Sequence, residues 1–420
     1  MVMPEKKITL LSPAGSWESL SAAIKAGADA VYFGVEQLNM RAGATKPFAL
    51  KDLAEIVARC RDQGCESYLA LNSIVYDQEI ALMHNILAEA ASAGVNAVIA
   101  TDIAAIVSSR EFGLPVHIST QANISNVQAV RFYAQFAEVM VLARELTLPQ
   151  IAAINSDIER QQIKSPSGKL VATELFIHGA MCVSISGMCY MSLAGKNASA
   201  NRGRCLQPCR KRYRVVDEES GEELIVDNRF IMSPKDLCMI GHIDKLIDAG
   251  VRVLKIEGRG RTADYVFHTT RAYRQAIDSV QRGDYSAEKI AAWNQELSAV
   301  FNRGFWFGGY YLGAKLGEWS GAYGSQATVQ KTYLGYINNY FLRPQVAQIV
   351  LENRGLSVGD TIAVIGPTTG YEERIITSLF VSEQPAVQAK KGDDVTISFD
   401  VKVRRHDKVY LLHPRTNWQS

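Results

Sequence analysis

Residues 8–34 read ITLLSPAGSWESLSAAIKAGADAVYFG, and this stretch decides the fold. Its two ends, Ile8–Leu11 and Ala30–Gly34, are short apolar runs of strand length. Between them, Trp17–Ala26 carries apolar residues at helical spacing, and Ser16 stands where a helix N-cap belongs. A buried strand, a helix and a second buried strand in succession predict a βαβ unit with parallel strands.

The same alternation continues through the first two-thirds of the chain. Further strands are predicted at Ser67–Leu71, Ala97–Ala100, Val116–Ser119, Val139–Leu142, Glu174–Ile177 and Val251–Ile256. Helices are predicted between them at Lys51–Gln63, Asp77–Ala93, Asp102–Arg110 and Asn126–Phe136. Eight strands separated by helices predict a closed, parallel, TIM-like (β/α)8 barrel of the α/β class. An open doubly wound sheet is the competing arrangement, although no G-x-G-x-x-G motif follows the first strand.

We expect this barrel to occupy residues 1–325 and to carry a Cys-rich insertion at about 179–231, after the seventh strand. In a barrel, segments that follow the strand C-termini build the active face. Helices predicted at Ala263–Arg282 and Ala287–Asn302 complete the barrel, and the aromatic, glycine-rich segment Gly304–Ser325 is predicted to be a linker.

The tail, residues 326–420, alternates short strands with turn residues and predicts a small C-terminal β-barrel domain. Its strands are expected at Thr332–Ile337, Ala347–Glu352, Thr361–Ile365, Glu373–Leu379, Asp394–Phe399 and Lys408–Leu412.

The composition is that of a globular protein. The chain has 420 residues, of which 47% are hydrophobic, and a net charge of +2 from 45 Lys+Arg and 43 Asp+Glu. This apolar content rules out a disordered chain, and no apolar run reaches the ~18 residues of a membrane helix. The first residues do not read as a secretory signal, so the seven cysteines are expected to be reduced in a cytoplasmic protein.

Four cysteines, Cys182, Cys189, Cys205 and Cys209, fall in the insertion with the spacing C-x6-C-x15-C-x3-C. Thiolates are soft ligands that suit zinc or an iron–sulfur cluster. The wide first pair is unlike the tight pairs of zinc ribbons and favours a [4Fe–4S] cluster. The alternative is that these four cysteines are buried thiols that bind no metal. If they do bind one, Cys238 could replace Cys209 as the fourth ligand.

Six basic residues stand close to the last two of these cysteines and predict a contact with RNA phosphates. They are Arg202, Arg204, Arg210, Lys211, Arg212 and Arg214, with Tyr213 among them as a residue that could stack on a base. The alternative is a solvated loop whose charge is balanced by the acidic residues of 217–223.

A second group of polar residues is expected at the ends of the barrel strands. Catalytic or carboxylate-binding roles are predicted for Arg144, His178, Lys255, Glu257 and Arg259, and substrate contacts for Asn72, His117 and Gln121. Arginine favours bidentate recognition of carboxylates, so a small carboxylate is the expected ligand. A simple ion pair between Lys255 and Glu257, which alternate along one strand, is the competing interpretation.

These motifs together carry a family resemblance. Residues 174–192, ELFIHGAMCVSISGMCYMS, resemble the signature of the collagenase-like peptidase family (class U, family thirty-two). The resemblance continues through 201–210, NRGRCLQPCR, and through LSPAG at 11–15, STQAN at 119–123 and KIEGR at 255–259. It therefore covers nearly the whole chain.

The resemblance implies a barrel that holds a four-cysteine iron–sulfur cluster. Members include RNA hydroxylation proteins and ubiquinone-biosynthesis hydroxylation factors, and some were named proteases. The chain most resembles members that hydroxylate the tRNA wobble uridine to 5-hydroxyuridine, a reaction that needs prephenate. A collagenase-like peptidase and a zinc-structured RNA-binding module stay as alternatives, although the sequence has no H-E-x-x-H helix and no G-x-S-x-G elbow. A protein partner is left open.

Overall fold

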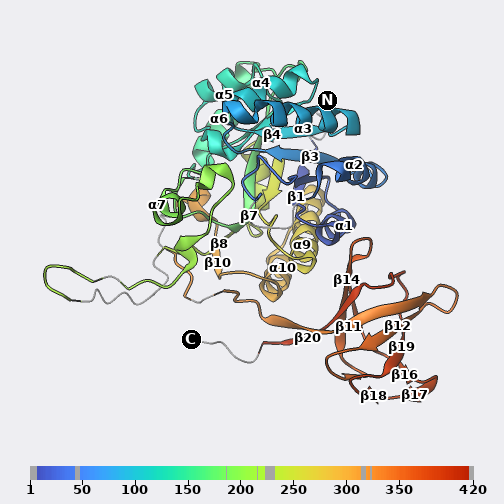
Figure 1. The fold of residues 1–420 in the computed structure, drawn as a ribbon. Helices are drawn as coiled ribbons and strands as arrows, with labels where there is room; N and C mark the ends of the chain where they lie inside the picture. The colour runs from blue at the N-terminus through green and yellow to red at the C-terminus, as the bar shows by residue number, and fades with distance from the viewer. Residues whose placement is uncertain are drawn as a thin grey trace.

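The structure, a computed structural model, describes residues 7–42, 48–185, 187–214, 216–222, 232–313, 318–321 and 324–415. The end of the predicted insertion, 223–231, lies outside these residues. Figure 1 shows a larger α/β domain joined to a smaller β domain. The chain enters the small domain only after completing the large one.

Eight parallel strands form a closed barrel in the large domain. They are β1 (Thr9–Pro13), β2 (Ala30–Phe33), β3 (Glu66–Leu71), β4 (Ala97–Ala100), β5 (Val116–Ile118), β6 (Val139–Val141), β7 (Ala172–Ala180) and β9 (Val253–Ile256). Neighbours in this order pair in parallel, and β9 pairs with both β7 and β1, which closes the ring. The predicted TIM-like barrel is therefore confirmed, because an open sheet would leave one of these two pairings unmade.

Helices surround the barrel between the strands. They are α1 (Trp17–Lys25), α2 (Leu53–Arg61), α3 (Ile80–Ala93), α4 (Ile103–Glu111), α5 (Val127–Tyr133), α6 (Leu148–Arg160), α8 (Ile243–Asp248), α9 (Ala263–Arg282) and α10 (Ala287–Ala299). Ser16 caps α1 as predicted, by accepting a hydrogen bond from the Ser19 N–H. Asp102 caps α4 by accepting from the Ala104 N–H. Each cap satisfies a backbone donor that the helix leaves unpaired.

Side chains on the strands alternate between two hydrophobic clusters, as the two-residue period of a strand requires. The outward set packs under the helices and includes Leu10, Val31 and Leu69. The inward set fills the barrel and includes Leu11, Tyr32 and Tyr68. The inner cluster shares its space with three ionisable residues described below.

The insertion after β7 is irregular, with one short helix, α7 (Met191–Lys196). The chain then adds β8 (Asp236–Cys238), antiparallel to β7, and β10 (Phe305–Phe307), parallel to β8. The predicted linker thus behaves differently from expectation, because its aromatic residues Trp306 and Tyr311 are buried in the barrel core. Large aromatic side chains gain more from this burial than they would in a solvated connection.

The small domain is antiparallel β, as predicted. Its main sheet runs β15-β14-β20-β11-β12-β19-β16-β17, and β13 (Leu356–Ser357) pairs separately with β18 (Gln388–Ala389). The strands of the main sheet are β11 (Val329–Phe341), β12 (Val346–Leu351), β14 (Thr361–Gly366), β15 (Gly370–Ile375), β16 (Leu379–Val381), β17 (Gln384–Ala386), β19 (Asp394–Ser398) and β20 (Lys408–Pro414). The segment expected as one strand at Glu373–Leu379 is divided between β15 and β16. The hairpin from β14 turns before Gly370, which is why β15 starts earlier than expected.

The two domains share an apolar contact. Ala22 of α1 and Ala263 of α9 pack against Ala363 and Tyr371 of the small domain. Gly370 lies so close to α1 that a Cβ there would meet the Ala22 backbone nitrogen at 2.8 Å. In the described part of the chain no helix has the length and apolar character that crossing a membrane requires.

Candidate functional site

A cavity of about 330 Å³ opens at the C-terminal mouth of the barrel. Loops that follow β2, β3, β5, β6, β7 and β9 contribute side chains to its wall, and the Cys-rich insertion supplies the rest. This is the face on which TIM barrels carry their active sites. Most of the predicted strand-end residues therefore lie at the same cavity as the insertion: Asn72, Gln121, Arg144, Lys255, Glu257 and Arg259.

All four insertion cysteines line this cavity: Cys182, Cys189, Cys205 and Cys209. None of the seven cysteines is in a disulfide, and these four are half-exposed. Burial raises the pKa of the Cys209 thiol, and the neighbouring Arg210 guanidinium opposes that rise. Four free thiols around one cavity are a donor set that fits a soft metal or an iron–sulfur cluster.

The arrangement of the side chains does not itself form a ligand shell. Among the described residues, no three Cys, His, Asp or Glu side chains converge closely enough to hold a metal ion. Cys238 lies apart from the four, fully buried on β8 and absent from the cavity wall, with its pKa raised by burial to about 11. This placement favours Cys209 over Cys238 as the fourth candidate ligand.

Positive charge dominates the rest of the wall. Among the described residues that line it, seven are basic and Glu257 alone is acidic; the basic ones are Arg41, Arg144, Arg210, Lys255, Arg259, Arg261 and Arg303. Burial lowers the pKa of Arg210, Arg259 and Arg261, so their charged forms lack full compensation inside the protein. A wall of this kind favours an anionic occupant.

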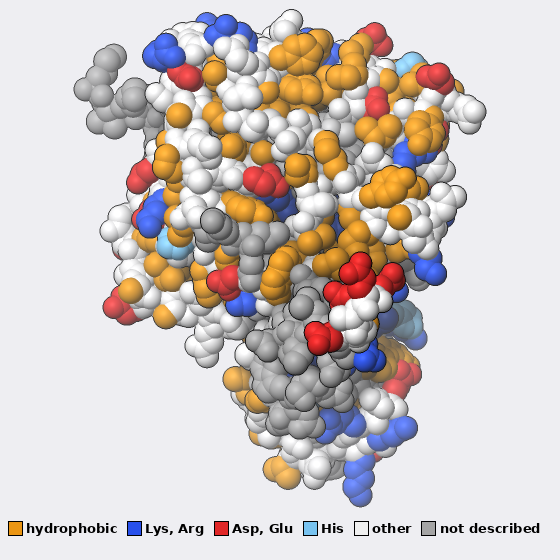
Figure 2. All heavy atoms as spheres, turned by 90° about the vertical axis from the view of Figure 1, so that its left-hand side faces the viewer, with side chains coloured by type: hydrophobic (Ala, Val, Ile, Leu, Met, Phe, Trp, Pro, Cys, Tyr) orange, Lys and Arg blue, Asp and Glu red, His pale blue; other side chains and the backbone are white. Residues whose placement is uncertain are grey.

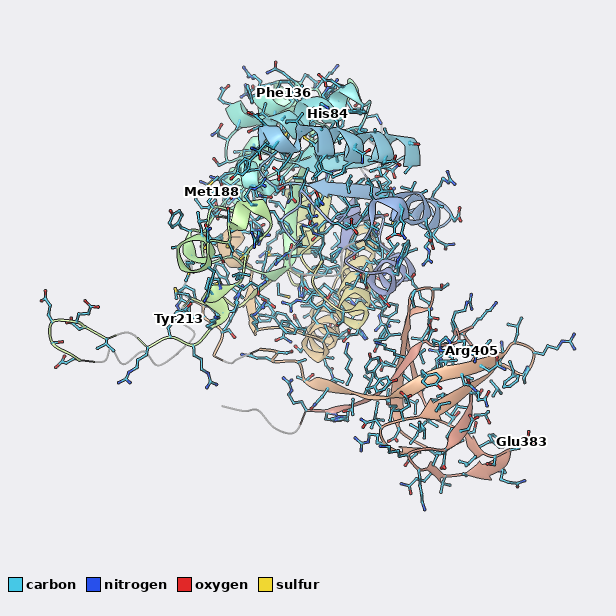
Figure 3. The ribbon with its side chains drawn as sticks, in the orientation of Figure 1. His84, Phe136, Met188, Tyr213, Glu383 and Arg405 are labelled. Atoms are coloured by element: carbon cyan, nitrogen blue, oxygen red, sulfur yellow. The ribbon has the colours of Figure 1, made fainter. Side chains whose placement is uncertain are left out.

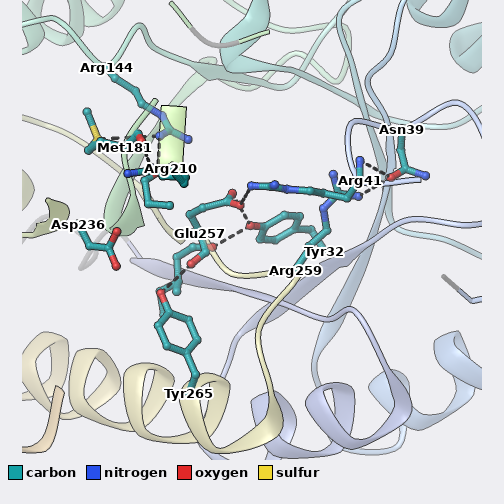
Figure 4. Close-up of polar contacts among 12 residues, drawn as sticks. Tyr32, Asn39, Arg41, Arg144, Met181, Arg210, Asp236, Glu257, Arg259 and Tyr265 are labelled. Atoms are coloured by element: carbon teal, nitrogen blue, oxygen red, sulfur yellow. Dashed lines mark hydrogen bonds and ion pairs between the residues drawn. The ribbon is translucent and has the colours of Figure 1, made fainter. Parts of the chain in front are cut away.

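Two glutamates, Glu174 and Glu257, form ion pairs with two of these basic residues. The sequence did not indicate either pairing. Lys255 Nζ lies 2.6 Å from Glu174 Oε1, and both side chains are at most 4% exposed. Glu257 Oε1 instead accepts from Arg41 Nη2 at 2.8 Å. The ion pair considered between Lys255 and Glu257 is therefore wrong. Lys255 is on β9 and pairs with Glu174 of β7 inside the barrel. Glu257 follows the end of β9 and turns toward Arg41 in the loop after β2 (Figure 4).

The Arg41–Glu257 pair belongs to a larger polar network at the cavity wall. Tyr32 donates to the Ile256 carbonyl at 2.8 Å and lies 3.4 Å from Glu257 Oε2, while Arg259 donates to Asn39 Oδ1 at 3.1 Å. Burial alone would raise the pKa of Glu257, but the nearby arginines outweigh burial and hold it at about 2. Glu257 is therefore a fixed negative charge that ties the β2 and β9 loops together.

Arg144 is the predicted residue best placed to bind a ligand. Its guanidinium lies over the Phe176 ring at 3.9 Å, and Nη1 donates to the Ala180 carbonyl at 3.1 Å. Its buried Nε has no hydrogen-bond partner. A buried guanidinium nitrogen without a partner, on a cavity wall, marks a place where an anion would be stabilised.

The predicted substrate-contacting residues divide into two groups. Asn72 and Gln121 line the cavity and are joined by a hydrogen bond of 2.7 Å from Asn72 Nδ2 to Gln121 Oε1. His117 is not on the cavity wall. It lies beneath it inside the barrel, with Nδ1 3.8 Å from Glu174 Oε2.

His178 is also away from the cavity, although a catalytic role was expected for it. The pairing of β7 with β9 shifts register between Phe176 and His178, which turns the histidine from the barrel interior to the helix side. There its Nδ1 lies 3.2 Å from the Tyr273 hydroxyl, and burial lowers its pKa to about 3. It is a neutral core residue that packs among Tyr265, Tyr273 and Phe305.

The six basic residues of the insertion also differ from one another in their surroundings. Arg202 forms a two-point ion pair with Glu79, its Nη1 lying 2.6 Å from Oε2, and stacks on Tyr76, which fastens the insertion to the start of α3. Arg210 donates to the Pro234 carbonyl at 2.8 Å and to the Ser233 hydroxyl at 3.0 Å. Arg204 and Arg212 are exposed. Figure 3 shows Met188 and Tyr213 of the insertion on one side of the barrel. Figure 2 views that side and shows hydrophobic side chains dispersed among charged ones.

Several residues of the site were not found from the sequence: Tyr32, Arg41, Glu174, Arg261 and Arg303. Glu174 carried a signal, because an acidic residue within a buried apolar strand needs a partner. Arg41 and Arg303 carried none, since their partners Glu257 and Asp236 are distant in sequence.

The chain is similar in sequence to several known proteins. The chain matches the family described as Peptidase family U32 over residues 15–321. A Porphyromonas gingivalis protein named collagenase is 49% identical over 406 residues, which are 97% of this chain and 98% of the relative. The tRNA hydroxylation protein P1 of Bacillus subtilis is 32% identical over 305 residues, 71% of this chain and 69% of the relative. An Escherichia coli 23S rRNA 5-hydroxycytidine synthase is 36% identical over 291 residues, 68% of this chain and 42% of the relative. The chain is therefore a member of peptidase family U32.

Proposed function

We propose that this chain is an iron–sulfur-dependent RNA hydroxylase that converts the wobble uridine of tRNA to 5-hydroxyuridine with the participation of prephenate. The observation that carries the proposal is the convergence of four free thiols and an excess of buried positive charge on one cavity at the barrel mouth. Relatives named for tRNA and rRNA hydroxylation support the choice of substrate class.

Cys182, Cys189, Cys205 and Cys209 would hold a [4Fe–4S] cluster. When bound, the cluster supplies the electron transfer that side chains cannot perform, and replacing C–H by C–OH at a pyrimidine carbon requires such chemistry. The nearby Arg210 and Arg41 would offset the negative charge of the thiolates.

The remaining cationic wall would position the small anion. Prephenate carries two carboxylates, and Arg144 with its unpartnered Nε is the group best placed to bind one of them. Lys255, Arg259 and Arg261 add positive charge around the same cavity. Asn72 and Gln121 line the same cavity and would offer amide donors and acceptors to an extruded base.

Exposed basic residues beside the mouth, among them Arg204 and Lys211, would hold the RNA backbone. Arg202 and Arg210 have structural partners and would serve instead to fix the shape of the insertion. The RNA interface is therefore smaller than the basic run in the sequence suggests.

The second candidate is a peptidase, favoured by the 49% identity to a relative named collagenase. The geometry gives it little support. Among the described residues, no histidine lines the cavity with the thiols, and His178, the nearest in sequence to Cys182, is in the aromatic core. A thiol nucleophile without an adjacent base is poorly activated.

Anaerobic purification tests the cofactor. The wild-type protein is expected to be brown and to contain iron and acid-labile sulfide in equal amounts, as is Cys238→Ser. Cys209→Ser is expected to lose most of both. Colourless protein with one zinc per chain would contradict the cluster and support the zinc-structured module.

Nucleoside mass spectrometry tests the reaction. The gene is expressed in a bacterium from which its own tRNA hydroxylation proteins have been deleted, and 5-hydroxyuridine is measured in the tRNA. Wild-type chain is expected to restore the nucleoside and Cys182→Ser is not. Arg160→Gln, on the outer surface of α6, serves as the control and should restore it fully. Absence of 5-hydroxyuridine together with cleavage of gelatin would favour the peptidase.

A further inference from the structure

Ionisable side chains form a column through the inside of the barrel, from the face opposite the cavity up to the cavity floor. It begins at Glu66, the exposed first residue of β3, whose Oε2 accepts a hydrogen bond from the Tyr68 hydroxyl. Tyr68 is only 5% exposed and belongs to the inner cluster of the barrel. The first step therefore connects solvent at one end of the barrel with its interior.

The middle of the column joins three strands at one level. The Tyr68 ring meets the His117 ring edge-on, with centroids 4.6 Å apart. On its other side, His117 Nδ1 lies 3.8 Å from Glu174 Oε2. Both atoms are buried and have no hydrogen-bond partner. Two complementary polar atoms that face each other in this way can bond after a shift of about 1 Å, the distance that separates them from hydrogen-bond contact.

The column ends at Lys255. Its Nζ lies 2.6 Å from the second oxygen of Glu174 and 4.5 Å from the centre of the Tyr32 ring, and the residue lines the cavity. Tyr68, His117 and Glu174 come from β3, β5 and β7, which are alternate strands of the barrel. Alternate strands supply one layer of a TIM-barrel interior, and such layers normally consist of branched apolar residues. A layer of tyrosine, histidine and glutamate needs a reason other than packing.

We propose that Glu66, Tyr68, His117, Glu174 and Lys255 form a proton relay that connects solvent at the N-terminal face of the barrel with the cavity at its C-terminal mouth. This inference rests on the proposed function for the reaction that it serves. The proposed function assigns only Lys255 of these residues to the cavity wall, and the relay adds a path behind it.

The transfer balances without any redox change. Lys255 Nζ passes a proton to Glu174 and accepts one from the ligand in the cavity, which restores the ammonium. Glu174 passes its proton to His117, and the histidine, tyrosine and Glu66 each release one proton as they receive one, so that one proton leaves to solvent. Histidine is suited to this role because both ring nitrogens can carry a proton.

The surrounding groups hold the relay in a defined resting state. Burial alone would raise the pKa of Glu174, but Lys255 and His117 outweigh burial and keep it below its usual range, so it rests ionised. Burial and the nearby carboxylates raise the pKa of Tyr68, and burial and Glu257 raise that of Tyr32, so both phenols rest protonated. Apart from these groups, the neighbours in the inner cluster are apolar, among them Ile99, Val139 and Val253.

The first test does not use the enzymatic reaction. Histidine-selective isotope labelling and NMR record, at one fixed pH, the chemical shifts of the two ring nitrogens of His117 in the intact protein. These shifts report which ring nitrogen carries a proton. Glu174→Gln replaces the carboxylate oxygen that faces Nδ1 with a neutral amide, so the signals of both ring nitrogens are expected to move. Unchanged signals would show that the two residues do not exchange a proton and would overturn the relay, whatever the chain hydroxylates.

The second test measures turnover of tRNA by the holoenzyme. Tyr68→Phe keeps the ring and removes only the hydroxyl, so it is expected to lower kcat by about 100-fold, the scale of a lost proton-transfer step, without changing KM. Added imidazole or another small weak acid should restore part of the rate. Glu66→Gln, at the exposed end, should behave alike, whereas Glu138→Gln, which loses only its bonds to Ser165 and Ser167, should match the wild type.

The outcomes are distinguishable. A kcat for Tyr68→Phe within about twofold of the wild type, or a lost rate that small acids do not restore, would overturn the relay while leaving the hydroxylase assignment intact. A chain that does not hydroxylate RNA would overturn the proposed function, and the ring-nitrogen signals of His117 would still decide whether the column exchanges protons.

Discussion

Replacing Glu174 by glutamine removes one charge of the buried pair at the floor of the cavity and leaves the other in place. Lys255 Nζ lies 2.6 Å from the Glu174 carboxylate, and the two side chains are 4% and 0% exposed. Two unit charges at that separation attract by ~6 kcal/mol at an effective dielectric constant of ~20, and the desolvation of the carboxylate offsets part of this. Breaking a buried pair from one side costs about 3–5 kcal/mol, because an unpaired charge remains inside.

We therefore expect Glu174→Gln to lower the free energy of unfolding of the barrel by about 3–5 kcal/mol, measured by urea denaturation followed by circular dichroism. The double variant Glu174→Gln/Lys255→Met removes both charges and should return to within about 1 kcal/mol of the wild type. Glu55→Gln, in an exposed pair with Arg59 on α2, is the matched control and should change stability by less than about 0.5 kcal/mol. The reasoning fails if the single variant is as stable as the control, or if the double variant is less stable than the single one.

Three further predictions concern the cavity and its supports. Arg144→Gln should weaken the binding of prephenate in isothermal titration by roughly 10- to 100-fold, the value of a charge-assisted hydrogen bond, and unchanged affinity would remove Arg144 from the site. Arg202→Met should release the insertion from Glu79, so that limited proteolysis cuts the insertion faster while the melting temperature of the barrel changes little; equal cleavage rates would contradict this. The pKa of Glu257 is depressed to about 2 in the folded state, so its contribution to stability, about 3 kcal/mol, is fully present above about pH 4.5 and is lost as the pH falls toward 2. Denaturation of Glu257→Gln across that range should show a weaker dependence on pH than the wild type.

The barrel could be predicted from the sequence because each of its strands and helices leaves a pattern within a few consecutive residues. Short apolar runs such as Ala30–Phe33 and Ala97–Ala100 are buried on both faces, and continuous apolar runs are typical of parallel strands. The cysteine cluster could also be predicted from the sequence, because four cysteines within one irregular segment can be assigned to one site without knowing the fold. Their common cavity then follows from the position of the insertion after a barrel strand.

Partners that are distant in the sequence could not be predicted. Lys255 and Glu174 are 81 residues apart, and Arg202 and Glu79 are 123 residues apart, so no local pattern relates them. His178 was misplaced for a different reason. Strict alternation along the strand would put it inside the barrel with Glu174, but a single bulge in the pairing with β9 reverses its direction. Periodicity alone does not reveal such a bulge.

The polar interior of the barrel also bears on the choice between the candidate functions. A module that only bound RNA through its surface would gain nothing from a charged pair with side chains at most 4% exposed, and its barrel would be more stable with apolar residues there. A peptidase that used an insertion thiol would need a base beside that thiol, and the only histidines near the cavity in the described chain lie beneath its floor or behind its wall. Sites where a sequence departs from the rules of its fold are commonly the sites of function. The departure here is a set of proton-exchanging groups directly under a cationic, thiol-lined cavity, and this arrangement is more useful to a reaction that moves charge than to binding or to peptide hydrolysis.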